Sequence, residues 1–155
     1  MPSPNPQSEP AKPARILIAD DNAQGVELLE AFLADADYEI RTAADGEETL
    51  RIVREWHPDV ILLDIMMPKI SGFEVCKRIR ANPASSDIVV LMITALDQPS
   101  DIDRAVDAGT NDFLTKPINK TELLVRVRSA LQSRRYKAQL DQALAYIEGV
   151  QRDKP

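Results

Sequence analysis

The sequence has a single cysteine, Cys76, so no internal disulfide can form, and it has no cluster of cysteine and histidine that could hold zinc. Long apolar runs are also missing, because the longest, 60–63 and 88–93, fall far short of the roughly 18 residues that span a bilayer. Residues 1–15 lack the apolar stretch of a secretory signal. We therefore expect a cytoplasmic protein without a membrane segment, in which Cys76 is a small buried side chain.

The chain also lacks a basic surplus, since its net charge is −6. Residues 1–119 carry 11 basic and 21 acidic side chains, whereas residues 120–155 carry 8 and 4. An acidic body repels phosphate, so we expect no direct binding of nucleic acid. We interpret the basic residues of the last segment as a solvated face, because they lack interleaved aromatic residues and a helix-turn-helix pattern. They are Arg126, Arg128, Arg134, Arg135 and Lys137.

Prolines are concentrated at the N-terminus, where five of the 11 fall in the first 13 residues. A segment with so few apolar side chains cannot offset the entropy cost of ordering, so we expect residues 1–14 to be disordered. The rest of the chain is long enough for one compact domain, which we place at residues 15–132. Residues 133–155 contain good helix formers, and we expect them to form a C-terminal helical extension.

Short apolar runs alternate with segments of helical spacing five times along the chain. The runs lack polar alternation, which indicates a parallel sheet covered by helices on both faces. Ser100 with Asp103, and Asn119 with Glu122, resemble capping pairs that open the last two helices. The predicted fold class is α/β, a doubly wound five-stranded parallel sheet of the flavodoxin-like kind with an extended C-terminal helix. The expected strands are 16–19, 38–42, 60–63, 88–94 and 112–115.

Polar side chains follow the carboxyl ends of four of these strands. Asp20 and Asp21 follow the first strand, Asp64 the third, Thr94 the fourth and Lys116 the fifth. Ligands of a doubly wound sheet bind outside this edge, near the point where the strand order reverses. Each signal is weak alone, since an Asp-Asp pair is usually a helix N-cap and a threonine is usually an ordinary strand residue. Their joint occurrence at successive strand ends favours a functional site.

Carboxylates crowded together repel one another unless their pKa values rise or a cation lies among them. Ligands that are all oxygen favour Mg²⁺, which Asp20 and Asp21 are well placed to share. Asp64 stands alone at the end of the central strand and is the better candidate for a nucleophile that forms an acyl phosphate. Thr94 and Lys116 would hold oxygens of the phosphoryl group. We also predict a cis Lys116–Pro117 peptide bond.

The chain resembles the receiver domain of two-component response regulators over roughly residues 14–132. The matching segments are ILIADDN (16–22), PDVILLDIMMPKISGFEVCKRIR (58–80), VVLMITA (89–95) and AGTNDFLTKPIN (108–119). The resemblance implies that Asp64 accepts a phosphoryl group from a phosphohistidine on a sensor histidine kinase or a phosphotransfer protein. It also implies that Asp20, Asp21 and the backbone carbonyl of Met66 complete the magnesium site.

The same resemblance implies a switch in which the Thr94 hydroxyl shifts toward the phosphate and an aromatic side chain at position 113 turns inward. That residue is Phe113 rather than the commoner tyrosine, so packing alone would have to carry the switch. Met66 and Leu96 occupy positions that, by the same resemblance, influence hydrolysis of the acyl phosphate. Both are apolar and neither could activate a water, so we expect slow self-dephosphorylation.

Beyond about residue 131 the resemblance ends, but the helical pattern continues. Apolar residues recur at a spacing of three and four in a narrow seam made of Tyr136, Leu140, Ala143, Ile147 and Val150. We expect a homodimer through this helix, with phosphorylation controlling its geometry. A solvated helix without a partner, or a linker to a following output domain, is the alternative.

Two rival functions remain open at this point. One is a magnesium-dependent phosphohydrolase with an aspartyl nucleophile, but such an enzyme usually needs a second acid two residues after the nucleophile, where this chain has Met66. The other is a binding module that has the fold without the phosphorylation, and the intact set of polar residues at the strand ends argues against it. We therefore predict a signalling switch and not a turnover enzyme.

Overall fold

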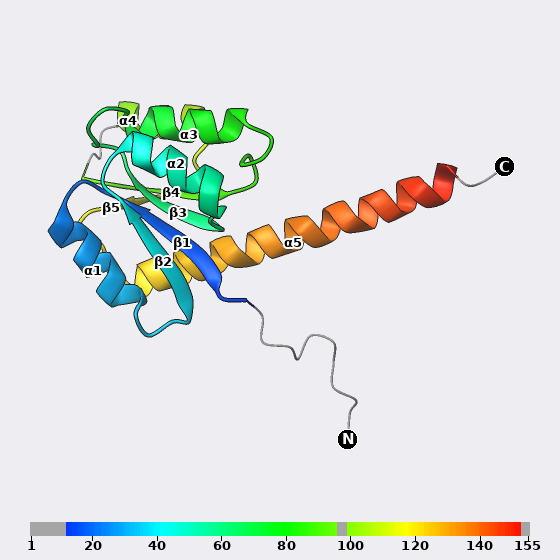
Figure 1. The fold of residues 1–155 in the computed structure, drawn as a ribbon, viewed down its shortest axis with the longest axis horizontal. Coiled ribbons are helices and arrows are strands. Elements are labelled where there is room, and N and C mark those ends of the chain that lie inside the picture. Colours follow the sequence, from blue (N-terminus) through cyan, green and yellow to red (C-terminus); the bar gives the residue numbers. More distant parts are fainter. Residues whose placement is uncertain (1–11, 96–98, 153–155) are drawn as a thin grey trace, which may run out of the picture.

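The computed structural model describes residues 12–95 and 99–152, and its side chains are described as far as residue 149. Five parallel strands in the order β2-β1-β3-β4-β5 form one sheet with helices on both faces (Figure 1). The predicted doubly wound α/β fold is confirmed. In chain order the elements are β1 (Ala14–Ala19), α1 (Ala23–Leu33), β2 (Tyr38–Ala43), α2 (Gly46–Trp56), β3 (Val60–Asp64), α3 (Gly72–Ala81), β4 (Val89–Thr94), α4 (Pro99–Ala108), β5 (Asp112–Thr115) and α5 (Lys120–Arg152).

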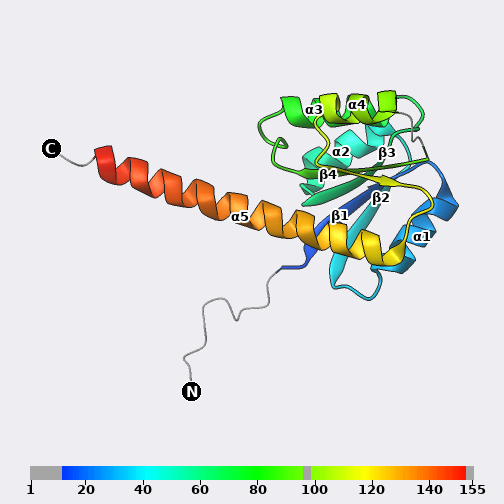
Figure 2. The ribbon, with the colours of Figure 1, turned by 180° about the vertical axis from the view of Figure 1, so that it is seen from behind.

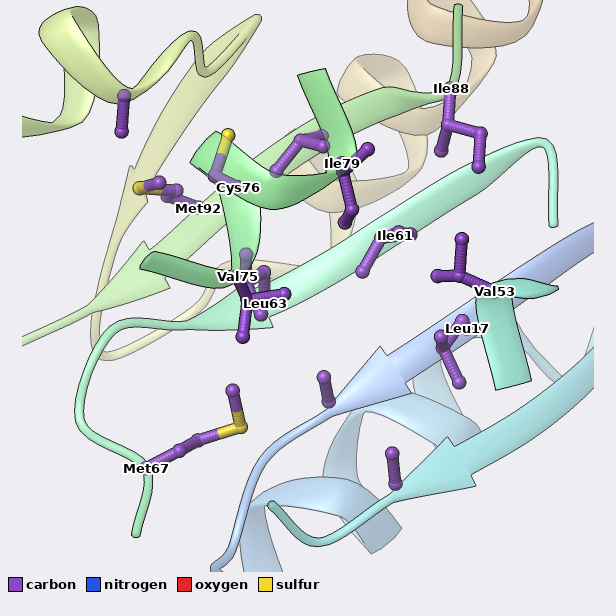
Figure 3. Packing of buried hydrophobic residues seen from close by; sticks show 14 of the residues in the cluster. Leu17, Val53, Ile61, Leu63, Met67, Val75, Cys76, Ile79, Ile88 and Met92 are labelled. Atoms are coloured by element: carbon purple, nitrogen blue, oxygen red, sulfur yellow. The ribbon is translucent and has the colours of Figure 1, made fainter. Parts of the chain in front are cut away.

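Successive residues of each central strand pack into different halves of the core, because side chains alternate between the faces of a strand. Ile61 of β3 lies in the cluster that α2, α3 and α4 cover, whereas Leu62 lies in the cluster that α1 and α5 cover. Figure 3 shows the first cluster, with Cys76 of α3 inside it. Cys76 is completely buried, as predicted, and burial raises the pKa of its thiol.

Helix boundaries agree with the sequence pattern except at the start of α4. The Asn119 side chain accepts a hydrogen bond from the Glu122 N–H at 3.0 Å, which confirms the predicted cap of α5. Helix α4 already begins at Pro99, whose fixed φ suits the first helical position, so the prediction that Ser100 opens the helix was wrong. At the N-terminus, β1 begins at Ala14, the last residue of the segment predicted to be disordered, while residues 1–11 lie outside the described residues.

Helix α5 has 33 residues and runs far beyond the body of the domain (Figures 1 and 2). Its first half packs against the sheet through Leu123, Val127 and Ala130, which are all buried. Its second half extends away from the body in both views. Within 12–95 and 99–152, no helix has both the length and the apolar character needed to cross a membrane.

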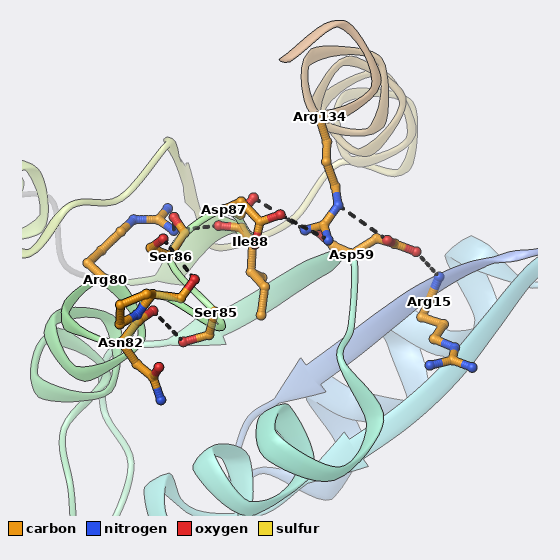
Figure 4. Close-up of polar contacts among 10 residues, drawn as sticks. Arg15, Asp59, Arg80, Asn82, Ser85, Ser86, Asp87, Ile88 and Arg134 are labelled. Atoms are coloured by element: carbon orange, nitrogen blue, oxygen red, sulfur yellow. Dashed lines mark hydrogen bonds and ion pairs between the residues drawn. The ribbon is translucent and has the colours of Figure 1, made fainter. Parts of the chain in front are cut away.

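Arg134 holds α5 where it leaves the body. Its guanidinium lies 3.4 Å from a carboxylate oxygen of Asp59 and 3.5 Å from one of Asp87, and it donates hydrogen bonds to the backbone carbonyls of both residues (Figure 4). The other carboxylate oxygen of Asp59 accepts the Arg15 N–H at 2.8 Å, so β1 joins the same network. The interpretation of the basic residues as a solvated face was therefore wrong for Arg134, which ties α5 to the loops before β3 and β4.

Candidate functional site

The polar residues predicted to meet at the carboxyl edge of the sheet do meet there. Asp20 and Asp21 follow β1, and Asp64 is the last residue of β3, so that carboxylate oxygens of the three residues lie within 4.8 Å of one another. Lys116 follows β5 and brings its ammonium to the same place. Thr94 ends β4, one residue beyond Ile93, the register partner of Asp64.

Asp64 is held by two donors that approach different oxygens of its carboxylate. Its Oδ1 accepts the backbone N–H of Met66 at 2.9 Å, and its Oδ2 accepts a hydrogen bond from Nζ of Lys116 at 2.9 Å. The carboxylate is nearly buried, with 6% of the residue exposed. The side chain of Met66, by contrast, points to solvent. Asp64 therefore has a defined orientation at the end of a buried strand.

The adjacent acids Asp20 and Asp21 differ in their surroundings. Asp20 is buried, its Oδ1 accepts the Asn22 N–H at 2.9 Å, and its Oδ2 lies 3.4 Å from Nζ of Lys116. Asp21 is exposed. Neither acid caps the following helix, because the side chain of Asn22 accepts the N–H groups of Gln24 and Gly25 at the start of α1. An Asp-Asp pair is usually explained as a helix N-cap, and this explanation does not apply to Asp20 and Asp21.

The site contains more acidic groups than basic ones, because the carboxyl groups of Asp20, Asp21 and Asp64 lie beside one ammonium, that of Lys116. Burial raises the pKa of Asp20 and the charge of Asp64 adds to this effect, although the Asn22 N–H and Lys116 oppose it. Burial by itself would lower the pKa of Lys116, but its hydrogen bond to Asp64 and the charges of Asp64 and Asp20 outweigh burial and raise that pKa. Three carboxyl groups lie beside a single ammonium, and a divalent cation would balance the negative charge that they can carry.

The neighbouring strands place the remaining predicted residues. Thr94 is buried, and its carbonyl accepts the Lys116 N–H at 2.8 Å, which joins the ends of β4 and β5. The Lys116–Pro117 peptide bond is cis. Phe113 of β5 is partly buried and packs against the core cluster that contains Met92, its register partner in β4. Leu96 lies outside the described residues.

Gly72 is a residue of this site that the sequence analysis missed. A Cβ atom at this position would lie 2.5 Å from the carbonyl oxygen of Asp64 and 2.7 Å from Cα of Ile65. The Gly72 N–H donates to the carbonyl of Ile65 at 2.9 Å, so the first turn of α3 rests directly on the backbone that follows Asp64. A glycine at the start of a helix is too common to reveal this contact, which becomes visible only in the folded chain.

Comparison with known proteins identifies close relatives of this arrangement. The family model described as the response regulator receiver domain matches residues 16–128. Response regulator PleD of Caulobacter vibrioides is 47% identical over 116 residues, which are 75% of this chain and 26% of PleD. The chain spans between about a quarter and about half of the length of the curated relatives that it matches.

Solved structures agree with the sequence relatives. Chemotaxis protein CheY4 of Vibrio cholerae has a TM-score of 0.73 and 32% sequence identity, over 77% of this chain and 100% of that chain. The receiver domain of sensor histidine kinase PA1611 from Pseudomonas aeruginosa has a TM-score of 0.73 and 27% identity, over 78% and 99%. The second of these structures contains a magnesium ion coordinated in its active site cleft.

Proposed function

The chain belongs to the response regulator receiver domain family, whose function is to accept a phosphoryl group, and from this premise we propose that Asp64 is the acceptor. The observation that supports this assignment is the orientation of the Asp64 carboxylate, which the Met66 N–H and the Lys116 ammonium hold at the carboxyl end of β3. A carboxylate fixed in this way needs little reorganisation to reach the transition state.

The proposed reaction transfers the phosphoryl group from a phosphohistidine of a sensor histidine kinase or a phosphotransfer protein. An oxygen of Asp64 forms a bond to phosphorus while the bond from phosphorus to the imidazole nitrogen breaks, and its electron pair stays on the imidazole. Lys116 keeps its proton and places its positive charge beside the phosphoryl oxygens, and the Thr94 hydroxyl donates a hydrogen bond to one of them. The product is an acyl phosphate on Asp64.

Incubation with Mg²⁺ and acetyl phosphate tests this function against its two rivals. A switch gains the mass of one phosphoryl group per chain and keeps it. A phosphohydrolase instead consumes many equivalents of acetyl phosphate, and a module without phosphorylation gains nothing. Mass spectrometry of the intact chain, together with an assay of the acetate released, separates the three outcomes.

The metal of the proposed site is Mg²⁺, held by Asp20, Asp21, Asp64 and the backbone carbonyl of Met66. The oxygen atoms of the three carboxylates and their excess negative charge fit this ion. Bound Mg²⁺ would supply positive charge that stabilises the oxygens of the transferred phosphoryl group. The magnesium ion in the similar Pseudomonas receiver domain supports the same choice.

Removal of divalent metal with EDTA is therefore expected to abolish phosphorylation of the chain. Asp21→Asn removes one ligand from an exposed position, so the folded domain should keep its stability while the Mg²⁺ concentration for half-maximal effect rises about tenfold or more. The measurement is the increase in melting temperature with added Mg²⁺, which reports binding to the folded state. Asp35→Asn, which changes an exposed acid just after the end of α1, is the control. Equal Mg²⁺ dependence in the two variants would argue against the proposed ligands.

Slow loss of the phosphoryl group is the next expected property. The side chain two residues after Asp64 is Met66, an exposed thioether that cannot accept a proton from an attacking water. We expect the phosphorylated chain to persist for minutes or longer after the donor is removed, as followed by mass. Met66→Glu, which places a carboxylate at this position, is expected to speed the loss. Loss from the unaltered chain within seconds, without a phosphatase, would contradict the proposal.

Thr94 and Phe113 form the proposed switch. When the Thr94 hydroxyl moves toward the phosphoryl group, it leaves space that the Phe113 ring can enter. Phe113 is already partly buried against the core. Its ring has no hydroxyl, so no polar group would lose hydrogen bonds to water when the ring turns inward. The proposed switch therefore depends on packing.

A second copy of the chain is the proposed partner of the α5 extension. Tyr136 and Leu140 expose 65% and 58% of their surface, and Leu144 and Ile147 each expose 49%. These side chains form an apolar stripe along the part of α5 that extends away from the body. Static light scattering is expected to give twice the chain mass at high concentration, whereas deletion of residues 133–155 gives a monomer. Equal association by the two proteins would place the dimer interface elsewhere.

A further inference from the structure

The apolar stripe of α5 (Tyr136, Leu140, Ala143, Leu144 and Ile147) lies on the side of the helix that faces away from the body. Leu123, Val127 and Ala130 are buried against the sheet, and Arg134 continues their side of the helix with its contacts to Asp59 and Asp87. At 3.6 residues per turn, the centre of the stripe lies roughly 125° around the helix from the centre of this side. A partner helix can therefore lie along the stripe without displacing the side of α5 that packs against the body.

We infer that the two α5 extensions pair in antiparallel orientation, so that the two bodies lie at opposite ends of the dimer. This inference rests on the proposed dimer and adds its direction. The two-fold axis passes between residues 141 and 142. Tyr136 then lies opposite Ile147 of the partner subunit, and Leu140 lies opposite Ala143 of the partner subunit. Each large side chain near the axis faces a smaller one, which favours interdigitation.

The charge distribution of the chain favours this direction over the parallel one. The segment 1–119 carries 11 basic and 21 acidic side chains, so a parallel pair would bring two strongly acidic bodies to the same end. An antiparallel pair separates the bodies by the length of the paired helices, which exceeds the Debye length of about 8 Å at physiological salt.

The charges of the extension itself point to the same arrangement. In residues 133–149 the basic side chains come first, at Arg134, Arg135 and Lys137, and the acidic side chains follow at Asp141 and Glu148. Residues 150–155 add two basic side chains and one acidic side chain. Antiparallel pairing places the acidic part of one helix beside the basic part of the other, with Lys137 near Glu148 of the partner subunit, and the symmetry makes this contact twice. In a parallel pair the two basic segments would lie side by side.

Disulfide trapping distinguishes the two directions, because Cys76 is completely buried and does not compete. Mixing a Tyr136→Cys chain with an Ile147→Cys chain of different tag length should give a cross-linked heterodimer under mild oxidation. Tyr136→Cys alone should give no cross-link, since the two positions would be eleven residues apart along the axis, roughly 16 Å. Ala145→Cys, on the opposite side of the helix, is the control for collisions in solution.

Each outcome bears on a different step of the inference. Cross-linking of Tyr136→Cys alone indicates the parallel direction and overturns the proposal, as does a dimer by light scattering that gives no cross-link in the mixture. A monomer by light scattering instead removes the dimer itself, and neither result touches phosphorylation of Asp64, which is measured separately.

A charge swap provides an independent test with the full side chains of the stripe in place. Lys137→Glu is expected to raise the dissociation constant of the dimer about tenfold. In each of the two symmetric contacts, the new glutamate would lie beside Glu148 of the partner subunit and repel it. Adding Glu148→Lys should restore the original value. Failure of the second substitution to rescue the first would count against the antiparallel pairing.

Discussion

Asp64→Asn is expected to abolish the mass gain that Mg²⁺ and acetyl phosphate give the unaltered chain. The amide of asparagine is too weak a nucleophile to form an acyl phosphate, so the loss should be complete. The fold should persist, because the substitution removes one of three crowded carboxylates and so relieves repulsion in the absence of metal. The measurement is the melting temperature in EDTA. If the variant keeps its fold, this temperature should equal or exceed that of the unaltered chain.

The control for Asp64→Asn is Asp35→Asn, an equal change of charge at an exposed acid whose contact is an ion pair with Lys120. This variant should be phosphorylated like the unaltered chain. If Asp64→Asn still gained one phosphoryl group, the acceptor would be a different carboxylate, and Asp21 would be the first to examine because it is exposed in the same cluster.

Gly72→Ala adds one methyl group at this site and is expected to lower the free energy of unfolding strongly. The new Cβ would lie 2.5 Å from the Asp64 carbonyl oxygen and would meet backbone, which cannot rotate away as a flexible side chain would. We expect a loss of about 3 kcal/mol in the free energy of unfolding, at the upper end of overpacking costs. Phosphorylation should also slow, because relief of the clash moves the backbone that positions Asp64.

Gly149→Ala is the matched control for this prediction. A Cβ at Gly149 meets nothing within 4 Å, and alanine has the higher helix propensity, so the change should be neutral or stabilise by up to about 1 kcal/mol. Urea unfolding followed by circular dichroism gives both free energies. A cost at Gly72 no larger than that at Gly149 would mean that α3 shifts easily over the loop after Asp64.

The fold could be predicted because its strands are apolar runs that end in polar residues, and the boundary of β3 at Asp64 is readable from residues 60–64 alone. The start of α4 was less predictable. A serine three residues before an acid favours a cap, but Pro99 directly before it can itself occupy the first turn of a helix. Local pattern does not decide between these two choices.

The candidate site was also accessible from the sequence, because parallel strands bring their carboxyl ends together and so collect Asp20, Asp64 and Lys116. Arg134 and Gly72 were not accessible in this way. Arg134 meets Asp59 and Asp87 across 75 and 47 residues of sequence, and nothing local distinguishes it from the other arginines of α5. Such long-range contacts depend on where the helix leaves the body, which only the folded chain determines.

The complete burial of β3, which β4 shares among the described strands, makes this strand a firm support at the centre of the sheet. All five residues from Val60 to Asp64 are buried, and β1 and β4 hold the strand on either side, so it has no room to stretch or slide. Helix α4, by contrast, buries only Ala105 and Ala108 among its described residues. We therefore expect the compliance of this domain at its edge, and we expect a chemical event at Asp64 to reach distant surfaces by deforming the α4 side while the central strand acts as a fixed support.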